Sequence, residues 1–561
     1  MTLLDWSVLV FTIGFIAIYG AWKARGGDAE SYLRDGTLRW PTIGLSIMAT
    51  QASAITFLST PGQAFEDGMR FVQFYFGLPL AMVVISAVFV PIYYRLKVYT
   101  AYEYLEHRFD HRVRYLGALL FLVQRGLAAG ITIYAPSIIL ASILGWRLDW
   151  VIVAIGLVVI GYTVSGGTKA VSQTQKQQMI VMMGGMAIAA AVVIWRLPGD
   201  VSLPSAVSLA GALDRMNVIS FDLDPGSRYN FWSGITGGFF LALSYFGTDQ
   251  SQVQRYLSGR SVTESRLGLI FNGMFKVPMQ FFILFIGILV FVFYLFTQPP
   301  VFFNQAALER ARATEHGVAL QDIEARYESA FAAQRDAASA YVAGRGDATL
   351  EAGARAKLRE AAAAVKEIRG EAKTLVAKAV PGTETKDADY VFLGFVLRYL
   401  PSGLVGLLIA VILCAAMSST ASELAALGQT STIDLWERAL GGTPRPERRL
   451  LVSKLFTVVW GLLAIGFATF ASLVDNLIEA VNILGSIFYG TVLGLFVVGF
   501  FLKRVSATPV LIAALVAQTI VAALYFGSDL GFLWFNVIGC AVVVILASIL
   551  EVVLPRRRPA A

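Results

Sequence analysis

Two hydroxyl side chains and a backbone oxygen share one face of a predicted helix near residue 418. In the stretch CAAMSSTASELAAL, Ala415, Ser418 and Ser419 stand at positions i, i+3 and i+4. Uncharged oxygen ligands suit a hard monovalent cation that must also be released, whereas a transition metal would need histidine or cysteine. Small hydroxyl residues also allow close helix packing, so the pattern leaves both a cation site and a packing role open.

A second polar stretch, WPTIGLSIMATQASAITFLSTPGQAF, is expected to cross the membrane as a helix that unwinds locally. It combines hydroxyl and amide side chains with the pair Pro61-Gly62; the polar residues are Thr50, Gln51, Ser53, Thr56, Ser59 and Thr60. An interrupted membrane helix frees carbonyl groups that can coordinate a cation, provided that they line a cavity or are buried in protein. Close packing against another helix is the alternative reading of the same residues.

Two cations are expected near the bilayer midplane. Arg125 and Lys276 each lie roughly 15 Å along a predicted helix from its cytoplasmic end, at a rise of 1.5 Å per residue. Such charges are costly in hydrocarbon, so each should be paired or face a cavity. Asp249 and Glu479 are expected nearer helix ends, which leaves no midplane carboxylate as a partner and favours an anionic solute. A structural role, in which the cations bind broken-helix carbonyls, is the alternative.

The elements that must position these residues are membrane helices. The chain has 561 residues, of which 57% are hydrophobic and only 15% charged, a balance that no water-soluble domain of this length tolerates. Long apolar stretches recur and are too long for barrel strands. About thirteen spans are predicted, at 4–22, 41–65, 72–94, 115–143, 148–165, 177–197, 230–250, 264–297, 395–424, 452–473, 477–501, 507–526 and 531–554.

Basic residues orient the spans. They gather in alternate short connections, which places the N-terminus outside and the C-terminus inside a multi-pass inner-membrane protein. The net charge of +7 is explained by this asymmetry, so no nucleic-acid partner is expected. Cys414 and Cys540 lie in apolar spans, which argues against a disulfide or zinc site. No obligatory protein partner is inferred; the expected partners are the lipid bilayer, a small-molecule solute and a cation.

Residues 303–388 break the apolar pattern. This segment is rich in Ala, Glu, Arg and Lys and is predicted to form an extramembrane helical insertion on the outside. A tolerated insertion and a lid or partner-docking element are both open readings.

Several motifs together resemble the sodium:solute symporter family. The best-matching stretches are ASAITFLSTPGQAFEDGMRF, YTAYEYLEHRFDHRVRYLG, VQRGLAAGITIYAP, VSGGTKAVSQTQ, FGTDQSQVQRYLSGRSVTESR and LCAAMSSTASELAAL. The first three look most like the branch that carries monocarboxylates, iodide and vitamins. The resemblance implies an all-α LeuT-type fold with a 5+5 inverted repeat around a midplane site.

The implied division of the chain follows that repeat. A leading helix and cytoplasmic link occupy 1–40, the first repeat 41–197, and the second repeat 230–302 together with 389–501. Two further helices and a basic cytoplasmic tail occupy 502–561.

By the same resemblance, particular residues are expected to bind sodium and solute. Carbonyls of the first core helix, and a carbonyl and two hydroxyls of the eighth, are expected to hold sodium: Ala49, Ala52, Ala415, Ser418 and Ser419. The solute is expected to contact Gln51, Ser53, Thr56, Gln73, Arg125, Tyr245 and Lys276. Arg125 looks like the carboxylate-binding arginine of sialate carriers, whereas Tyr245 and Lys276 fall where sugar carriers have a gating aromatic and a sugar-binding lysine. The sugar carriers' acid is absent from FVQFYFGLPLAMVV and their asparagine is Ala242, which favours a carboxylate.

One departure concerns the number of coupled ions. Many family members carry an aspartate of a second sodium site after the GG-x-K-A-V motif, where this chain has Gln175. A neutral amide cannot supply that charge, so one coupled sodium is expected and no other cofactor. Proton coupling is the alternative, and it is less favoured because the sequence shows no buried carboxylate or histidine relay. The predicted function is sodium-coupled import of a small organic solute, a carboxylate, by alternating access, and no enzymatic activity is expected. The alternatives are a sodium-coupled sugar or amino-acid symporter, a cation channel or a membrane sensor.

Overall fold

A computed structural model describes residues 1–24, 36–227, 229–381, 385–442, 445–470 and 477–554. The expected cytoplasmic link around 25–35, the end of the 452–473 span and the basic tail from 555 lie outside these ranges. The described residues form helices joined by turns, with one isolated parallel bridge between Leu38 and Gly259.

The helices of the first half form the part of the bundle that surrounds the polar stretch near residue 52. Their bounds are α1 Leu3–Ala24, α3 Trp40–Gln51, α4 Ala54–Asp67, α5 Leu78–Val84, α6 Val90–Leu96, α7 Ala101–Arg108, α8 His111–Leu144, α9 Leu148–Trp195 and α10 Leu203–Ala212. A 3-10 helix at Gly68–Tyr75 and a π-helical turn at Ile85–Phe89 complete this half. Inside α9 the chain turns sharply at Gly167, whose φ of 56° favours glycine, so α9 supplies two membrane spans.

The second half contains the remaining membrane helices and the extramembrane segment. Their bounds are α11 Gly238–Thr248, α12 Gln250–Leu257, α13 Val262–Phe296, α14 Gln305–Arg312, α15 Gly317–Ala343, α16 Ala348–Ala379, α17 Ala388–Tyr399, α18 Leu404–Thr430, α19 Pro446–Phe470, α20 Leu477–Phe501, α21 Ala507–Gly527 and α22 Leu533–Val553. π-Helical turns lie at Ser233–Gly237 and Ser431–Glu437. Helix α18 packs against α1, α8, α9 and α19 and is buried along most of its length.

Eleven described stretches are long and apolar enough to cross a membrane. Two expected spans, 41–65 and 230–250, are not found as single stretches among these eleven, because each of them is a broken helix. The first divides into α3 and α4, and the second into a π-helical turn, α11 and α12. The expected start of the 395–424 span is wrong, because α17 ends at Tyr399 and α18 begins at Leu404 after Gly403, whose φ is 88°.

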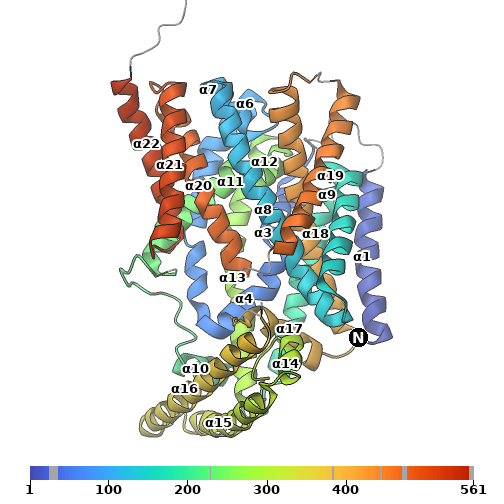
Figure 1. Ribbon diagram of the computed structural model, residues 1–561, viewed down its shortest axis with the longest axis vertical. Coiled ribbons are helices and arrows are strands. Elements are labelled where there is room, and N and C mark those ends of the chain that lie inside the picture. Colours follow the sequence, from blue (N-terminus) through green and yellow to red (C-terminus); the bar gives the residue numbers. More distant parts are fainter. Residues whose placement is uncertain (25–35, 228, 382–384, 443–444, 471–476, 555–561) are drawn as a thin grey trace, which may run out of the picture.

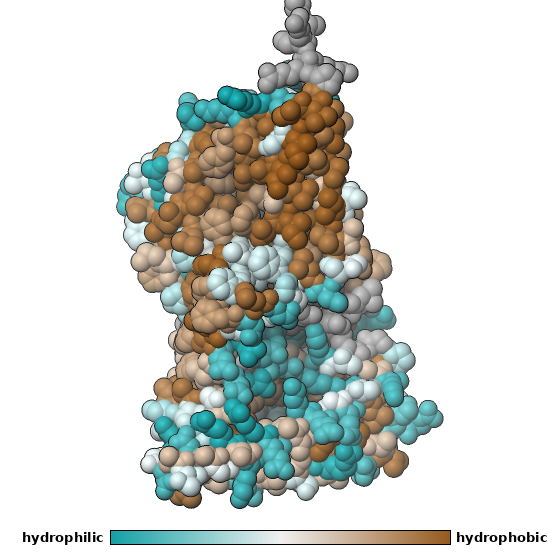
Figure 2. Space-filling model, turned by 90° about the vertical axis from the view of Figure 1, so that its left-hand side faces the viewer, coloured by the Kyte–Doolittle hydropathy of each residue, from teal (hydrophilic) through white to brown (hydrophobic). Residues whose placement is uncertain are grey.

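The extramembrane helices α14, α15 and α16 gather at one end of the bundle, with α15 lying against α16 (Figure 1). The N-terminus lies at the same end, whereas α22 finishes at the opposite end (Figure 1). We call α15 and α16 together the hairpin. On the face shown in Figure 2, the surface over the bundle is mainly hydrophobic and the surface of the end that carries the hairpin is mainly hydrophilic. This division is what a bilayer around the bundle and water around the hairpin require.

Close contact between α4 and its neighbours fixes the outer half of the broken helix. A Cβ atom on Gly62 would lie 1.8 Å from the carbonyl oxygen of Ala388, so α4 and α17 can approach this closely only with glycine.

We expect Gly62→Ala to destabilise the protein by about 1–3 kcal/mol, because the backbone of α4 or α17 must move to make room for the methyl group. Thermal unfolding of the purified protein measures this, with Gly184→Ala as the matched control since its Cβ meets no atom within 4 Å. Equal unfolding temperatures of the two variants would contradict the close contact.

Candidate functional site

The first broken helix opens at Ala52 and Ser53. Helix α3 ends at Gln51, and Ala52 and Ser53 have ψ angles of 76° and 173° before α4 begins at Ala54. The expected local unwinding is confirmed, nine residues before Pro61, which lies inside α4. A break frees the last carbonyls of α3 from helical hydrogen bonds, so they can accept from other groups.

Helix α18 faces this break with the hydroxyls that the sequence singles out. Ser418 Oγ donates to the Ala49 carbonyl oxygen at 2.9 Å and to the Ala415 carbonyl oxygen at 3.0 Å. Ser419 Oγ donates to the Ala415 carbonyl oxygen at 2.9 Å. The structure thus brings these four residues together and buries them completely or nearly so. We call Ala49, Ala415, Ser418 and Ser419 the oxygen cluster.

The oxygen cluster has the chemistry of a sodium site. Its ligands are two carbonyl and two hydroxyl oxygens, all uncharged, which suits a monovalent cation that is bound and then released. Ala52, the fifth expected ligand, is buried at the break itself and ends α3 with a hydrogen bond from its N–H to the Met48 carbonyl, 2.8 Å long.

A small cavity of about 80 Å³ adjoins the oxygen cluster, because Ser419 belongs to both. Seven helical elements and the break between α3 and α4 contribute to its wall. The lining residues are Thr50, Gln51, Ser53, Ile55, Thr56, Phe74, Tyr75, Arg125, Thr132, Leu241, Tyr245, Ser419, Glu423, Val481, Asn482 and Tyr489. We call this space the central cavity. Small-molecule sites usually measure about 300–1,000 Å³, so it has room for only a few non-hydrogen atoms.

Arg125 on α8 lines the central cavity, and its guanidinium is paired. Its Nη2 is bound to a carboxylate oxygen of Asp249, and its Nη1 donates to Glu423 Oε1 at 3.1 Å. The Tyr489 hydroxyl accepts from Arg125 Nη2 and donates to Asp249 at 3.0 Å. The expectation that no midplane carboxylate neutralises Arg125 is therefore wrong, and an unpaired positive cavity no longer argues for an anionic solute.

Asp249 is one of the two carboxylates that pair with Arg125 against expectation, and a helix break explains its position. Residues 230–250 were expected as one continuous helix with Asp249 near its end, but Asp249 is extended and separates α11 from α12. Its Oδ1 accepts from the backbone N–H and hydroxyl of Ser251, at 2.9 and 2.6 Å, and caps α12. The break thus brings the carboxylate to Arg125. Broken helices at corresponding positions of two repeats are typical of midplane sites in transporters.

Glu423 was missed, although a signal was present in the sequence. It stands four residues after Ser419 and so shares its helix face, which turns toward the central cavity. Thr132 Oγ1 on α8 donates to Glu423 Oε2 at 2.8 Å, so both carboxylate oxygens have partners.

The remaining expected solute contacts divide into two groups. Gln51, Ser53, Thr56 and Tyr245 line the central cavity, and the Arg125 guanidinium carbon lies 5.3 Å from the centre of the Tyr245 ring. Gln73 and Lys276 are fully buried outside the lining.

Each member of the second group has its own surroundings. Gln73 Oε1 accepts from the backbone N–H of Ser220 at 3.0 Å, and its Nε2 donates to the Tyr229 carbonyl at 3.2 Å, so it holds the connection before α11. The Lys276 ammonium lies 5.7 Å from the centre of the Tyr75 ring and has no hydrogen-bond partner among the described residues. Tyr75 lines the cavity, so Lys276 is a neighbour of the lining.

Gln175 on α9 joins α3 to α18 beside the oxygen cluster. Its amide nitrogen lies 3.0 Å from Thr50 Oγ1, 3.0 Å from the Ser418 carbonyl oxygen and 2.7 Å from Ser422 Oγ. Its amide oxygen accepts from Ser46 Oγ. Three oxygens from two helices therefore surround one nitrogen that donates hydrogen bonds.

The architecture matches a solved transporter structure. The structure of a sodium-coupled sialic acid symporter superimposes with a TM-score of 0.76, covering 99% of this chain and 98% of that one at 23% identity. At this identity the match concerns the fold alone. Together with the eleven candidate spans, it defines a multi-pass membrane protein with the LeuT-type fold of secondary transporters.

Sequence comparison then defines the family. The model of the sodium:solute symporter family matches residues 32–321 and 364–517, and the chain belongs to that family. The human sodium/iodide cotransporter is 35% identical over 297 residues, 52% of this chain and 45% of its own length. The sodium-coupled monocarboxylate transporter 1 of Xenopus laevis is 34% identical over 276 residues, 48% of this chain and 44% of its own length. The matches therefore span a little under half the length of these curated relatives, and the relatives are transporters, not enzymes.

Proposed function

We propose that this protein imports a small monocarboxylate together with one sodium ion by alternating access. The observation that carries the proposal is that Ser419 belongs both to the oxygen cluster and to the wall of the central cavity. A cation and a solute bound there would lie side by side, and each would stabilise the other's binding because their charges are opposite.

The groups of the central cavity support a carboxylate in spite of the pairing of Arg125. Arg125 Nε is buried without a hydrogen-bond partner among the described residues, so its N–H remains as a donor for a solute. Gln51 Oε1 is likewise buried without a described partner and could accept from a hydroxyl. The volume of about 80 Å³ suits a short acid better than a sugar. Of the two curated relatives named above, one is described as a sodium-coupled monocarboxylate transporter.

The surroundings of Gln175 support a single coupled ion. The amide nitrogen has three oxygen neighbours within 3.0 Å, and a second cation there would have to displace these hydrogen bonds. An amide in place of a carboxylate also offers no negative charge to compensate a cation's loss of water.

A second candidate is symport of a zwitterionic amino acid. Glu423 lines the central cavity, and the cluster of Arg125 with Asp249 and Glu423 contains one more carboxylate than cations. A solute ammonium could bind Glu423 while its carboxylate binds Arg125.

Uptake into proteoliposomes tests both candidates. We expect an inward sodium gradient to accumulate a labelled short monocarboxylate, and an inside-negative potential set with potassium and valinomycin to change that accumulation little. One sodium with one monoanion moves no net charge, whereas each net charge would couple at about 2.3 kcal/mol per 100 mV. Competition by unlabelled monocarboxylates, sialate, sugars and amino acids identifies the solute.

The possible outcomes separate the readings. Accumulation that rises several-fold with the inside-negative potential would exclude coupling of one sodium to one monoanion. Inhibition by amino acids alone would show that the solute is a zwitterionic amino acid and not a monocarboxylate. Uptake that does not depend on the sodium gradient would contradict sodium coupling.

A further inference from the structure

A second cavity lies at the end of the bundle that carries the hairpin. It measures about 570 Å³ and lies between α16, the segment that follows α10, and the ends of α4 and α13. This volume falls within the usual range of about 300–1,000 Å³ for small-molecule sites. We call it the hairpin cavity. In the predicted orientation it opens to the outside of the cell.

Cationic side chains dominate its wall. Five cations line the hairpin cavity against two carboxylates, Glu66 and Asp214; the cations are Arg215, Arg359, Lys366, Arg369 and Lys373.

Three of these cations form ion pairs. Arg359 binds Asp214 at 2.9 Å, Lys373 binds Glu66 at 3.0 Å, and Arg369 binds Asp387 at 3.0 Å. These pairs attach the hairpin to α4, to the segment after α10 and to the start of α17.

The other two cations lack such a partner. Neither Arg215 nor Lys366 forms an ion pair with a described carboxylate, and Arg215 Nε is buried without a described hydrogen-bond partner. Burial lowers the pKa of the Arg215 guanidinium, although the nearby Asp67 and Glu66 carboxylates act in the opposite direction. An anion in the cavity would supply the missing acceptor and the missing charge.

The floor of the hairpin cavity is aromatic. Phe65 from α4 and Phe291 and Tyr294 from α13 line it. The Arg215 guanidinium carbon lies 5.0 Å from the centre of the Phe291 ring, so one charged group stands directly over the apolar floor. A ligand that fits this wall has an anionic head and a flat or branched apolar body.

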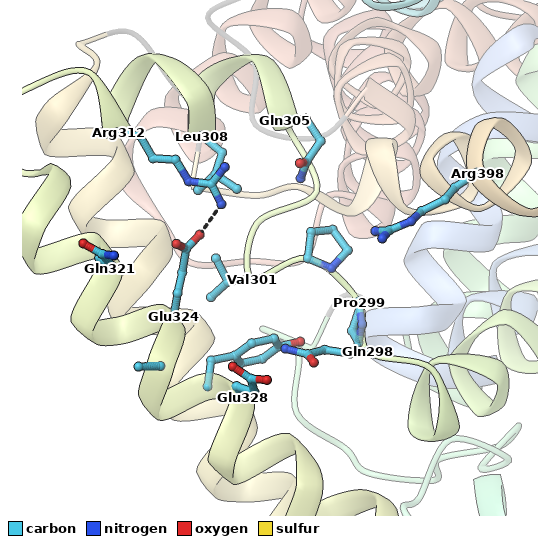
Figure 3. A pocket seen from close by; sticks show the side chains of 13 residues that line it. Gln298, Pro299, Val301, Gln305, Leu308, Arg312, Gln321, Glu324, Glu328 and Arg398 are labelled. Atoms are coloured by element: carbon cyan, nitrogen blue, oxygen red, sulfur yellow. Dashed lines mark hydrogen bonds and ion pairs between the residues drawn. The ribbon is translucent and has the colours of Figure 1, made fainter.

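A neighbouring cavity shows that cationic character is not general at this end. It shares Pro299 and Tyr327 with the hairpin cavity and measures about 530 Å³. Figure 3 shows Arg312 paired with Glu324 across it, at 2.6 Å, and Glu328 and Arg398 on its wall. Its two cations are balanced by two carboxylates, which leaves no charge to attract an anion.

We propose that the hairpin cavity is a second, regulatory site for an organic anion with an apolar body, such as an aromatic carboxylate. The bound anion bridges α16 to the ends of α4 and α13. Helix α4 carries Thr56 of the central cavity at its other end, so the bridge restrains a helix that must move when access alternates. The site binds its ligand without transporting it, and occupancy slows transport.

Binding of 2-naphthoate to the full chain in lipid nanodiscs tests the site. We expect saturable binding in equilibrium dialysis, weakened at least about tenfold by Lys366→Glu because reversal of one charge puts a carboxylate beside the anion's head. Lys357→Glu is the matched control, since Lys357 is exposed on the same helix and nine residues away, on the opposite face. Both positions are exposed, and thermal unfolding checks that both variants are folded.

The affinities of the variants for 2-naphthoate test the hairpin cavity, whatever solute the protein transports. Equal affinities of the Lys366 and Lys357 variants would overturn it. Loss of binding in Arg125→Ala with full binding in Lys366→Glu would place the probe in the central cavity and would overturn it as well. In sodium-driven uptake, 2-naphthoate should lower the maximal rate at unchanged KM; a raised KM at unchanged maximal rate would mean competition at the central cavity.

Discussion

Ser418→Ala will raise the sodium concentration for half-maximal uptake by about ten- to a hundredfold. The hydroxyl contacts the Ala49 and Ala415 carbonyl oxygens, and its removal takes one ligand from a cluster with few alternatives. Loss of a hydrogen-bonding or ligand oxygen from a buried site costs about 1–3 kcal/mol, a change of about five- to 150-fold in affinity, and the expected range lies within these limits. Uptake rates over a sodium titration in proteoliposomes measure the change, and Ser419→Ala should act in the same direction.

Ser137→Ala is the matched control for these variants. Ser137 is also fully buried in a membrane helix, and its hydroxyl donates to the Ile133 carbonyl one turn earlier at 2.7 Å. It should leave the sodium dependence unchanged. If both Ser418→Ala and Ser419→Ala, at normal amounts in the membrane, keep the parental sodium dependence, the oxygen cluster is a packing contact.

Arg125→Ala will abolish uptake, to below about 1% of the parental rate, and will also destabilise the protein. The substitution leaves Asp249 and Glu423 buried without their cation, and breaking a buried ion pair in this way costs about 3–5 kcal/mol. Thermal unfolding and uptake measure the two effects. Arg147→Ala is the control, because its pair with Asp149 is exposed and should contribute less than about 1 kcal/mol.

A second variant separates stability from solute binding. In Arg125→Ala combined with Glu423→Gln, one of the two unpaired charges is removed, so stability should partly return while uptake stays abolished. Sodium should still raise the unfolding temperature of this double variant, since Arg125 contacts neither carbonyl nor hydroxyl of the oxygen cluster. Uptake at near-parental affinity in either variant would show that Arg125 is structural only.

Local patterns in the sequence were enough to predict three of the four residues of the oxygen cluster, those on α18. Ser418 and Ser419 are near each other in the chain and on one helix face, and the unwound segment follows from polar residues packed into a single span. The contact between Ser418 and Ala49 joins residues 369 positions apart, and the resemblance to a family supplied it.

Local patterns could not predict the partners of Arg125. The contribution of Asp249 depends on a helix break, and a continuous helix through 230–250 has the same apolar composition as a broken one. The spacing from Ser419 places Glu423 on the same helix face, but its pairing with Arg125 required knowledge of which face of α18 meets α8. Neither fact is encoded in the spacing of apolar residues, because both arise from packing between distant helices.

The hairpin shows the same limit. Its helices follow from a composition rich in Ala, Glu, Arg and Lys, with strong helix propensity. Its position over α4 depends on contacts such as that of Lys373 with Glu66, which joins residues 307 positions apart. The domain boundaries drawn from the sequence stay predictions.

If one sodium ion is coupled, as we propose from the surroundings of Gln175, the stoichiometry limits how far the solute can be concentrated. A carrier that moves one sodium with one monoanion can raise the internal concentration no further than the sodium concentration ratio itself, about tenfold for a tenfold gradient. Two sodium ions would square that ratio, to about a hundredfold, and add the membrane potential. Under the proposed stoichiometry, in which the amide nitrogen bound to Thr50, Ser422 and the Ser418 carbonyl replaces a second ion, the maximal accumulation is lower, and each solute molecule imported uses one sodium ion. Such a carrier suits a solute that is abundant outside and consumed quickly inside.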